Sequence, residues 1–419
     1  MERALLVTIK LSSEKNNWHL EDYALELEEL TATCGAEVVD NIPCLRDKPT
    51  PSLFIGKGKA EEIALLAQEE NIDVVIFSHD LSGVQQRNLE EIIGRKTIDR
   101  TQLILDIFAR HAKTLEGKTQ VALAQCQYLM PRLIGKGLIL SRTGGGIGTS
   151  GLGEQRLEID RRLIRKKIDR LKEDLRQMHQ HQQLMRKKRK DSATPTIALV
   201  GYTNAGKSTL LNTLTGAGQV VANSLFTTLD PLAKSLKLPN GENIIVSDTV
   251  GFLHNLPHHL IEAFKATLEE ATETDLIIHV LDASNPRAHD LNQAVLDVLK
   301  ELDVEDKTMI TALNKIDLIT DPAWLNKLLR DFPDSVAISA KLNQGIDKLL
   351  EKIQGNFQGS MLAIKIIIPH SRMDLVDLFY RKGKVEEIDY QQKGIKISVN
   401  LPKDIAHKIL QDKDIKPIY

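Results

Sequence analysis

Residues 201–208, GYTNAGKS, fit the pattern G-x-x-x-x-G-K-[ST], the spacing of a loop that wraps the phosphates of a nucleotide. The glycines let the backbone curl until its N–H groups and the N-terminus of the following helix surround the phosphates. Lys207 then reaches the β- and γ-phosphates, and Ser208 coordinates Mg²⁺. An apolar strand, TIALV, precedes the loop, and a helix-like run, TLLNTLTG, follows it. These residues therefore predict a nucleotide site that holds a magnesium ion.

Two later stretches suit the γ-phosphate end of such a site. In FTTLDP, Thr228, or alternatively Thr227, can close over the γ-phosphate and Mg²⁺. In DTVGF, Asp248 stands at the end of a strand for a direct or water-mediated Mg²⁺ contact, and the Gly251 N–H comes within reach of the γ-phosphate. The expected catalytic residues are Lys207, Thr228 and Gly251, and the expected Mg²⁺ ligands are Ser208, Thr228 and Asp248.

Two further stretches select the base. NKID supplies Asn314, Lys315 and Asp317 after an apolar strand, and SAK offers the Ala340 N–H after another. Guanine presents an N1–H and an N2 amine side by side, which one carboxylate accepts together, whereas adenine leaves that carboxylate poorly paired. We therefore expect Asp317 to select GTP over ATP, with Lys315 over the purine plane and Ala340 donating to O6. The expected GTP- and GDP-binding residues are Gly201, Asn204, Ala205, Gly206, Lys207, Ser208, Thr209, Phe226, Thr228, Asp248, Gly251, Asn314, Lys315, Asp317, Ser339, Ala340 and Lys341.

In this order, the five stretches resemble those of the Ras-like, translation-factor-related GTPases, which implies hydrolysis of GTP to GDP and phosphate. Many of those proteins carry a glutamine after D-x-x-G that orients the attacking water. Phe252 stands there in this chain, and a phenyl ring cannot orient water by hydrogen bonding. Asn204 is a candidate K⁺ ligand, because related GTPases with asparagine at this position use it so; an ordinary turn residue is the alternative. We expect hydrolysis that is slow in the isolated protein and stimulated by a partner.

A second glycine-rich stretch, 143–162, reads TGGGIGTSGLGEQRLEIDRR and contains the dinucleotide-binding fingerprint G-x-G-x-x-G at Gly146, Gly148 and Gly151. That fingerprint needs a buried strand before the glycines and an apolar helix after them. Here a helix candidate precedes the glycines and a highly charged run follows them. We therefore expect a helical hairpin whose tip, residues 134–153, forms the bend.

The second helix of this hairpin is the most charge-biased part of the chain. From Arg161 to Lys190 there are 13 Lys or Arg and 3 Asp or Glu, a net charge of +10. Such a helix neutralises RNA phosphates, and a glycine tip lets backbone approach RNA closely. A solvated charged coiled coil is the alternative. Apolar residues near heptad spacing would pair the two helices: Leu157, Ile164, Ile168, Leu171 and Leu175.

These motifs belong to a multidomain α/β protein. Strands alternate with helices up to about residue 112, which predicts a small parallel α/β domain with a loop around Pro43, Pro49 and Pro51. We expect four parts: an N-terminal parallel α/β domain (1–115), a basic helical hairpin (116–190), a Ras-like P-loop GTPase domain with a mostly parallel sheet (196–355), and a small C-terminal α+β module (360–419).

Two features of the N-terminal domain stay open. GKGK, from Gly56 to Lys59, is either a phosphate or rRNA contact through Lys57 and Lys59 or a simple helix-entry turn. His79 and Asp80 follow a strand, but the sequence offers them no third partner, so we assign them no role.

Composition excludes several classes of protein. Three cysteines in 419 residues, Cys34, Cys44 and Cys126, have no metal-ligand spacing, which argues against a disulfide framework and for a reducing compartment. The N-terminus does not resemble a signal peptide, and no apolar run approaches about eighteen residues. We therefore expect a cytoplasmic protein without a membrane span, and nothing in the sequence demands more than a monomer.

The combination of FIGKGKAEEI, GGGIGTSGLGEQRLEIDRR before a long basic helix, GYTNAGKSTLLN, LFTTLDP and DTVGF resembles the HflX family of ribosome-associated GTPases. The resemblance covers residues 1 to about 355. It implies binding to the large ribosomal subunit and its rRNA near the peptidyl-transferase region through the hairpin, GTPase stimulation by ribosomes, and rescue or splitting of stalled ribosomes under stress. The family's tip reads close to G-P-G-E-T-Q-L-E, whereas this chain has Leu152, Gln155 and Arg156, so its detailed tip contacts differ.

Two other functions remain open from the residues alone. One is an RNA chaperone or ribosome-assembly scaffold whose binding GTP regulates. The other is GTPase-controlled signalling through a protein partner, for which the charge of the hairpin would not matter.

Overall fold

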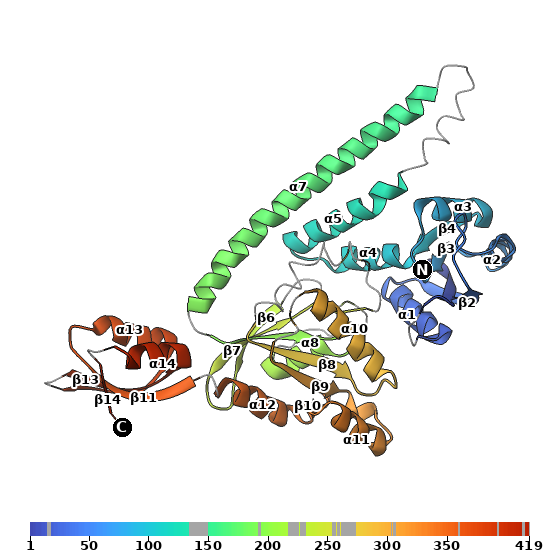
Figure 1. The fold of residues 1–419 in the computed structure, drawn as a ribbon. Helices are drawn as coiled ribbons and strands as arrows, with labels where there is room; N and C mark the ends of the chain where they lie inside the picture. The colour runs from blue at the N-terminus through green and yellow to red at the C-terminus, as the bar shows by residue number, and fades with distance from the viewer. Residues whose placement is uncertain are drawn as a thin grey trace.

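The computed structural model describes residues 1–14, 18–133, 150–191, 194–216, 226, 232–253, 257, 260, 274–302, 304, 307–358, 361–391, 394–412 and 415–418 (Figure 1). Within the helix over 150–191, it describes the side chains of residues 158–180. The expected multidomain α/β class is confirmed. An N-terminal parallel α/β domain is followed by a projecting helical hairpin, a second α/β domain and a C-terminal module.

The N-terminal domain is a parallel sheet between two layers of helices. Its elements are β1 (Arg3–Leu11), α1 (Leu20–Thr33), β2 (Glu37–Arg46), α2 (Lys57–Glu69), β3 (Val74–Phe77), α3 (Gly83–Ile93), β4 (Lys96–Asp99) and α4 (Arg100–His111). The strand order is β2-β1-β3-β4. Successive β1 residues point to opposite faces, so Leu6 packs with α1 and α4, while Leu5 packs with α2 and α3.

The expected loop around Pro43 is wrong, because Pro43 lies within strand β2. Strand β2 pairs only with β1 and forms the edge of the sheet. A proline is tolerated there, because an edge strand has one side on which no N–H is needed for the ladder. The apolar run LFIG (53–56) also predicts a short strand, and this prediction is wrong: Phe54 makes only an isolated bridge with Thr50, at a left-handed φ of 63°.

Helices α5 (Leu115–Arg132) and α7 (Ser150–Asp191) form the expected hairpin, and the long α7 projects away from the rest of the chain (Figure 1). Buried Leu123 and Cys126 of α5 pack against Ile168 of α7. The pairing expected from heptad spacing is confirmed for Ile164, Ile168, Leu171 and Leu175, while the side chain of Leu157 lies outside the described residues. Helix α7 begins at Ser150, so Gly151 is helical and the bend is shorter than expected. Residues 134–149 lie outside the described part.

Arg132, at the end of α5, fixes the root of the hairpin to the N-terminal domain. Its guanidinium donates to the Asp99 carboxylate at 2.7 Å and to the Leu81 carbonyl at 2.6 Å. The same group lies 3.4 Å from the ring centroid of Tyr128, whose hydroxyl donates to Asp99 at 2.9 Å. Because the Asp99 side chain is fully buried, these bonds join the hairpin and the sheet into one body.

The second α/β domain has six strands in the order β10-β9-β8-β5-β7-β6, all parallel except β6. Its elements are β5 (Thr196–Val200), α8 (Lys207–Thr215), β6 (Leu232–Lys237), β7 (Asn243–Asp248), β8 (Leu276–Asp282), α10 (Ala288–Glu301), β9 (Met309–Asn314), α11 (Pro322–Asp331), β10 (Ser335–Ala337) and α12 (Ile346–Gln358). The sequence from His258 to Ala271 also predicts a helix, and this range lies almost wholly outside the described residues. Strand β6 and helices α11 and α12 have no counterpart among our sequence expectations.

The C-terminal module is an antiparallel sheet with helices packed on it. Its elements are β11 (Met361–Ile368), α13 (Met373–Lys382), β12 (Lys384–Gln391), β13 (Gly394–Pro402), α14 (Lys403–Leu410) and β14 (Lys416–Pro417). The strand order is β12-β13-β11-β14, in agreement with the expected α+β unit.

One hydrophobic cluster continues from the N-terminal domain into the second α/β domain. It includes Leu27 of α1 and Phe108 of α4 on one side, and Tyr202, Phe226 and Phe252 on the other. A shared core of this kind packs the two domains against each other as tightly as a domain interior. Among the described residues, no helix is long and apolar enough to cross a membrane.

Candidate nucleotide site

Strand β5 and helix α8 hold the phosphate loop between them, and two glycines make its path possible. Gly206 caps α8 with a φ of 94°, and a Cβ there would lie 2.3 Å from Asn314 Nδ2. A Cβ on Gly201 would lie 2.3 Å from the Val280 carbonyl oxygen. Neither position has space for a side chain, so the loop needs glycine at both ends.

Lys207 is the first residue of α8 and directly follows the phosphate loop. Its Nζ donates to the carbonyls of Gly201 at 3.0 Å and Tyr202 at 2.9 Å. Burial lowers the pKa of Lys207 from 10.5 to about 8, although the Asp248 carboxylate opposes that shift. The ammonium thus carries a desolvation penalty that a polyphosphate would relieve, because bound phosphates supply negative charge and hydrogen-bond acceptors.

The magnesium ligands expected at the start of α8 and the end of β7 come together. Ser208 Oγ donates to Asp248 Oδ2 at 2.7 Å. A hydroxyl and a carboxylate beside a phosphate loop suit Mg²⁺, which takes one or two protein oxygens together with phosphates and water. No group of three or more His, Cys, Asp or Glu residues in the described ranges could hold a metal by itself. Thr227 and Thr228 lie outside the described residues.

Side-chain bonds tie the base loops to the phosphate loop. Asn314 Nδ2 donates to the Ala205 carbonyl at 2.8 Å, while its Oδ1 accepts the Ala340 N–H at 3.0 Å. The Ala340 N–H that we expect at guanine O6 is therefore engaged by Asn314 here. Ser339 Oγ donates to Asp317 Oδ1 at 2.6 Å, which orients the carboxylate expected to read guanine. The role of Asn314 as a brace between the two loops was not foreseen.

Two lysines, Lys315 and Lys341, complete the expected base site. Lys315 adopts a left-handed φ of 63°, and its Nζ forms a 2.7 Å ion pair with Asp282 at the end of β8. Lys341 is exposed. The pair with Asp282 holds the Lys315 side chain at the carboxyl edge of the sheet, the edge at which the phosphate loop also lies.

The DTVGF stretch is joined to the phosphate loop through its backbone. The Thr203 N–H donates to the Phe252 carbonyl at 2.8 Å, and the Phe252 N–H donates to the Gly201 carbonyl at 3.1 Å. A Cβ on Gly251 would lie 3.1 Å from Lys207 Nζ, so the Gly251 backbone lies beside the ammonium that we expect to bind phosphate. The Phe252 ring is 1% exposed within the shared core and cannot orient a water molecule.

The N-terminal domain touches this site directly, which sequence reasoning missed. Glu26 of α1 accepts a hydrogen bond from the Tyr202 hydroxyl of the phosphate loop, and its Oε1 accepts two from Arg100, at 2.9 Å and 2.6 Å. Phe226, expected among the nucleotide-binding residues, packs its ring edge-on against Phe108, with centroids 4.6 Å apart. No local sequence signal identifies the two contacts between the domains, because Glu26 and Tyr202, like Phe108 and Phe226, lie more than a hundred residues apart.

A second contact closes the same interface. Arg287, which follows β8, forms a 2.6 Å ion pair with Asp22 of α1. Its guanidinium also lies 4.5 Å from the ring centroid of Trp18. Asp22 and Glu26 are one helical turn apart on α1, so a single face of that helix contacts the nucleotide-binding domain at two places.

The structure gives hydrogen-bond or ion-pair partners to His79 and to the lysines of the GKGK stretch in the N-terminal domain. His79 Nε2 lies 2.9 Å from Glu14 Oε1, and its Nδ1 lies 3.0 Å from Ser78 Oγ. Lys57 and Lys59 lie in the first turn of α2 and pair with glutamates three or four residues on, as a helix-entry turn does. These pairs favour the structural alternative for GKGK.

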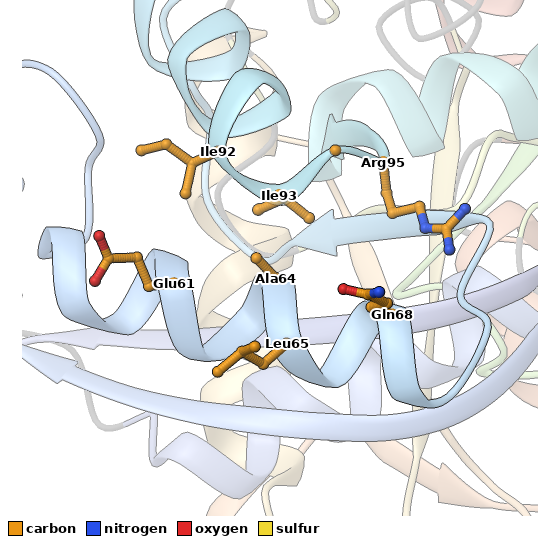
Figure 2. Close-up of a pocket in the computed structure, with 8 residues that line it drawn as sticks. Glu61, Ala64, Leu65, Gln68, Ile92, Ile93 and Arg95 are labelled. Carbon is orange, nitrogen blue, oxygen red and sulfur yellow. The ribbon is translucent and has the colours of Figure 1, made fainter.

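A shallow cavity of about 540 Å³ lies between α2 and the end of α3 (Figure 2). Glu61 and Gln68 line it from α2, and Ile92 and Arg95 line it from the other side. These helices pack on the face of the N-terminal sheet opposite α1 and α4, so the cavity is remote from the phosphate loop.

Models of protein families match the chain in four successive ranges. A GTP-binding GTPase N-terminal model matches residues 21–109, and a GTP-binding GTPase middle region matches 111–189. A 50S ribosome-binding GTPase model matches 196–315, and an HflX C-terminal domain matches 326–412.

Similar proteins extend over nearly the full length. The GTPase HflX of Caldanaerobacter subterraneus is 42% identical over 97% of this chain and 93% of its own length. The GTPase HflX of Escherichia coli is 38% identical over 96% of this chain and 94% of its own length. Among solved structures, a GTP-binding protein from Sulfolobus solfataricus in complex with GDP is 24% identical over 86% of this chain and 99% of its own, with a TM-score of 0.45. The full-length matches confirm the expected resemblance, and the chain belongs to the HflX family of GTPases.

Proposed function

We propose that this GTPase binds the large ribosomal subunit through its basic hairpin and uses GTP to rescue or split stalled ribosomes under stress. The observation that carries the proposal is the exposed charge of α7. Arg162, Arg165, Lys166 and Lys167 are exposed, and none of them forms an ion pair within the described part of the chain. Unpaired cations along one helix suit a surface of RNA phosphates.

The contacts between domains support a link from nucleotide to hairpin. Phe226 and Tyr202 belong to the nucleotide site, and both contact the N-terminal domain. That domain in turn holds the end of α5 through Arg132. GTP would order the loop that contains Thr228 and Gly251, and hydrolysis would release it. A change in that loop would therefore reach the hairpin through packed side chains rather than through a flexible linker.

Ser208, Asp248 and Thr228 would hold Mg²⁺, which would neutralise the charge that develops on the phosphates during hydrolysis. Ser208 and Asp248 already lie in contact, which supports two of these three ligands. Asn204 has a left-handed φ of 60°, a conformation that asparagine adopts readily in turns. Asn204 stays a candidate K⁺ ligand. A GTP hydrolysis rate in K⁺ buffer that equals the rate in Na⁺ buffer would exclude this role.

The proposal is tested by mixing the protein with intact ribosomes and following their dissociation by light scattering. Scattering should fall with GTP and stay constant with GDP. Binding without dissociation would instead favour an RNA chaperone or assembly scaffold.

A charge variant then tests the hairpin. Replacing Arg162, Arg165 and Lys166 by Gln should abolish the response and lower the salt dependence of binding. A matched control replaces three exposed lysines elsewhere: Lys237, Lys300 and Lys348. Equal activity of both triple variants would point to a protein partner rather than RNA.

A further inference from the structure

One hydroxyl in the phosphate loop has no hydrogen-bond partner among the residues that the structure describes. The Thr203 side chain is 6% exposed, and its Oγ1 is buried without a partner in this structure. Buried hydroxyls in folded proteins are nearly always paired, since an unpaired one has lost its bonds to water without replacement. An unpaired hydroxyl inside a nucleotide site indicates a group whose partner arrives with the ligand.

The surroundings of Thr203 show which part of the ligand that would be. Its N–H donates to the Phe252 carbonyl at 2.8 Å, so the residue lies against the DTVGF backbone. From the point where a Cβ on Gly251 would stand, Thr203 Cγ2 is 2.7 Å away and Lys207 Nζ is 3.1 Å away. The Thr203 methyl group and the Lys207 ammonium therefore both lie beside the Gly251 backbone at the γ-phosphate end of the site, and the Thr203 hydroxyl is carried on the same Cβ as that methyl group.

Hydrolysis needs a polar group at this end that Phe252 does not supply. In the reaction, a water oxygen bonds to the γ-phosphorus while the bond from that phosphorus to the oxygen bridging to the β-phosphate breaks. GDP leaves with the electron pair, and the water protons pass to phosphate and solvent. A hydroxyl both accepts and donates, so it can accept a hydrogen bond from the attacking water while it donates to a γ-phosphate oxygen.

The geometry points to Thr203 as a catalytic residue for GTP hydrolysis, whose hydroxyl contacts the attacking water and the γ-phosphate. The Thr203 hydroxyl thereby makes the contact to the attacking water that a glutamine would make at the position of Phe252. The inference concerns hydrolysis itself and does not depend on the ribosome.

The test compares Thr203→Val, which removes the hydroxyl and keeps the shape, with Thr203→Ser, which keeps the hydroxyl. Single-turnover hydrolysis is measured on the full chain with Mg²⁺, and the Kd values for GTP and GDP are measured with fluorescent nucleotides. We expect Thr203→Val to slow hydrolysis about 100-fold, the effect of losing one transition-state hydrogen bond, with both Kd values changed less than about 3-fold. Thr203→Ser should stay within about 3-fold of the original rate.

Thr215→Val is the matched control, because Thr215 lies on α8 and bonds only the Leu211 carbonyl. Its rate should equal that of the unaltered protein. An unchanged rate in Thr203→Val would overturn the inference, as would equal losses in the Val and Ser variants. If weaker GDP binding in Thr203→Val accounted for the whole loss of hydrolysis rate, the role of Thr203 would be structural, and the inference would be overturned. Measured with and without ribosomes, these rates keep the two proposals separate, because absent ribosomal stimulation counts only against the proposed function.

Discussion

Glu26 joins the N-terminal domain to the phosphate loop, and Glu26→Gln tests how much that joint contributes. The carboxylate accepts two bonds from Arg100 and one from Tyr202, and the Glu26 and Arg100 side chains are 9% and 10% exposed. Removing one charge of such a buried pair leaves the other uncompensated, at a typical cost of 3–5 kcal/mol. Arg100 lies in the same domain as Glu26, so that cost falls on the N-terminal domain itself; across the interface, glutamine weakens the Tyr202 bond by about 1.5 kcal/mol, which is a factor of about 10 in the opening equilibrium between the domains.

Amide hydrogen exchange measures that equilibrium. In the Glu26→Gln variant, amides of α1 and of residues 201–206 should exchange about 10-fold faster, because their protection depends on the closed interface. Glu21→Gln is the matched control, since Glu21 lies on the same helix and is exposed. It makes the same change of charge without touching the interface.

Tyr202→Phe completes the test as a double-mutant cycle. Its effect should be smaller when Glu26 is already Gln, since both changes remove the same hydrogen bond. Strict additivity would refute the coupling. Exchange in Glu26→Gln that matches Glu21→Gln would refute the account of the interface altogether.

Three further predictions concern the nucleotide site. Asp317→Asn should weaken GTP binding at least about 100-fold and improve binding of xanthosine triphosphate, whose O2 accepts the new amide N–H; unchanged preference in a competition assay would contradict the base-reading role. Burial lowers the pKa of Lys207 to about 8, and bound phosphates would raise it. GDP affinity measured by calorimetry should therefore fall up to about tenfold per pH unit above pH 8, and an affinity that does not change with pH would contradict this role of Lys207. Burial and the positive charge of Lys207 lower the pKa of His279 to about 4. Between pH 6.5 and 4, His279 is therefore protonated in the unfolded chain and neutral in the folded chain. Stability should therefore fall by about 3 kcal/mol as pH drops through that window, and His279→Leu should lose this term in urea titrations at several pH values; equal acid sensitivity would contradict it.

Local chemistry made the phosphate loop and the strand ends predictable. The roles expected of Gly201, Gly206, Lys207 and Ser208 depend on backbone shape and side-chain reach, which their spacing alone indicates. The hairpin was likewise readable, because the apolar residues that pair α7 with α5 recur at helical spacing.

Contacts between distant segments were not predictable in this way. Glu26 and Tyr202 are 176 residues apart, and nothing local marks either as a partner of the other. The loop predicted at Pro43 was wrong for a related reason. Whether a proline fits a strand depends on the place of that strand in the sheet, which only the tertiary fold decides. The orphan hydroxyl of Thr203 also becomes visible only when burial and hydrogen bonds are known.

The GTPase rate with and without large ribosomal subunits tests most directly whether nucleotide turnover is coupled to the hairpin. The account predicts strong stimulation of the unaltered protein and of the Lys237, Lys300 and Lys348 control, and none when Arg162, Arg165 and Lys166 are replaced by Gln. A rate that the subunits leave unchanged, or that rises equally in both triple variants, would contradict it.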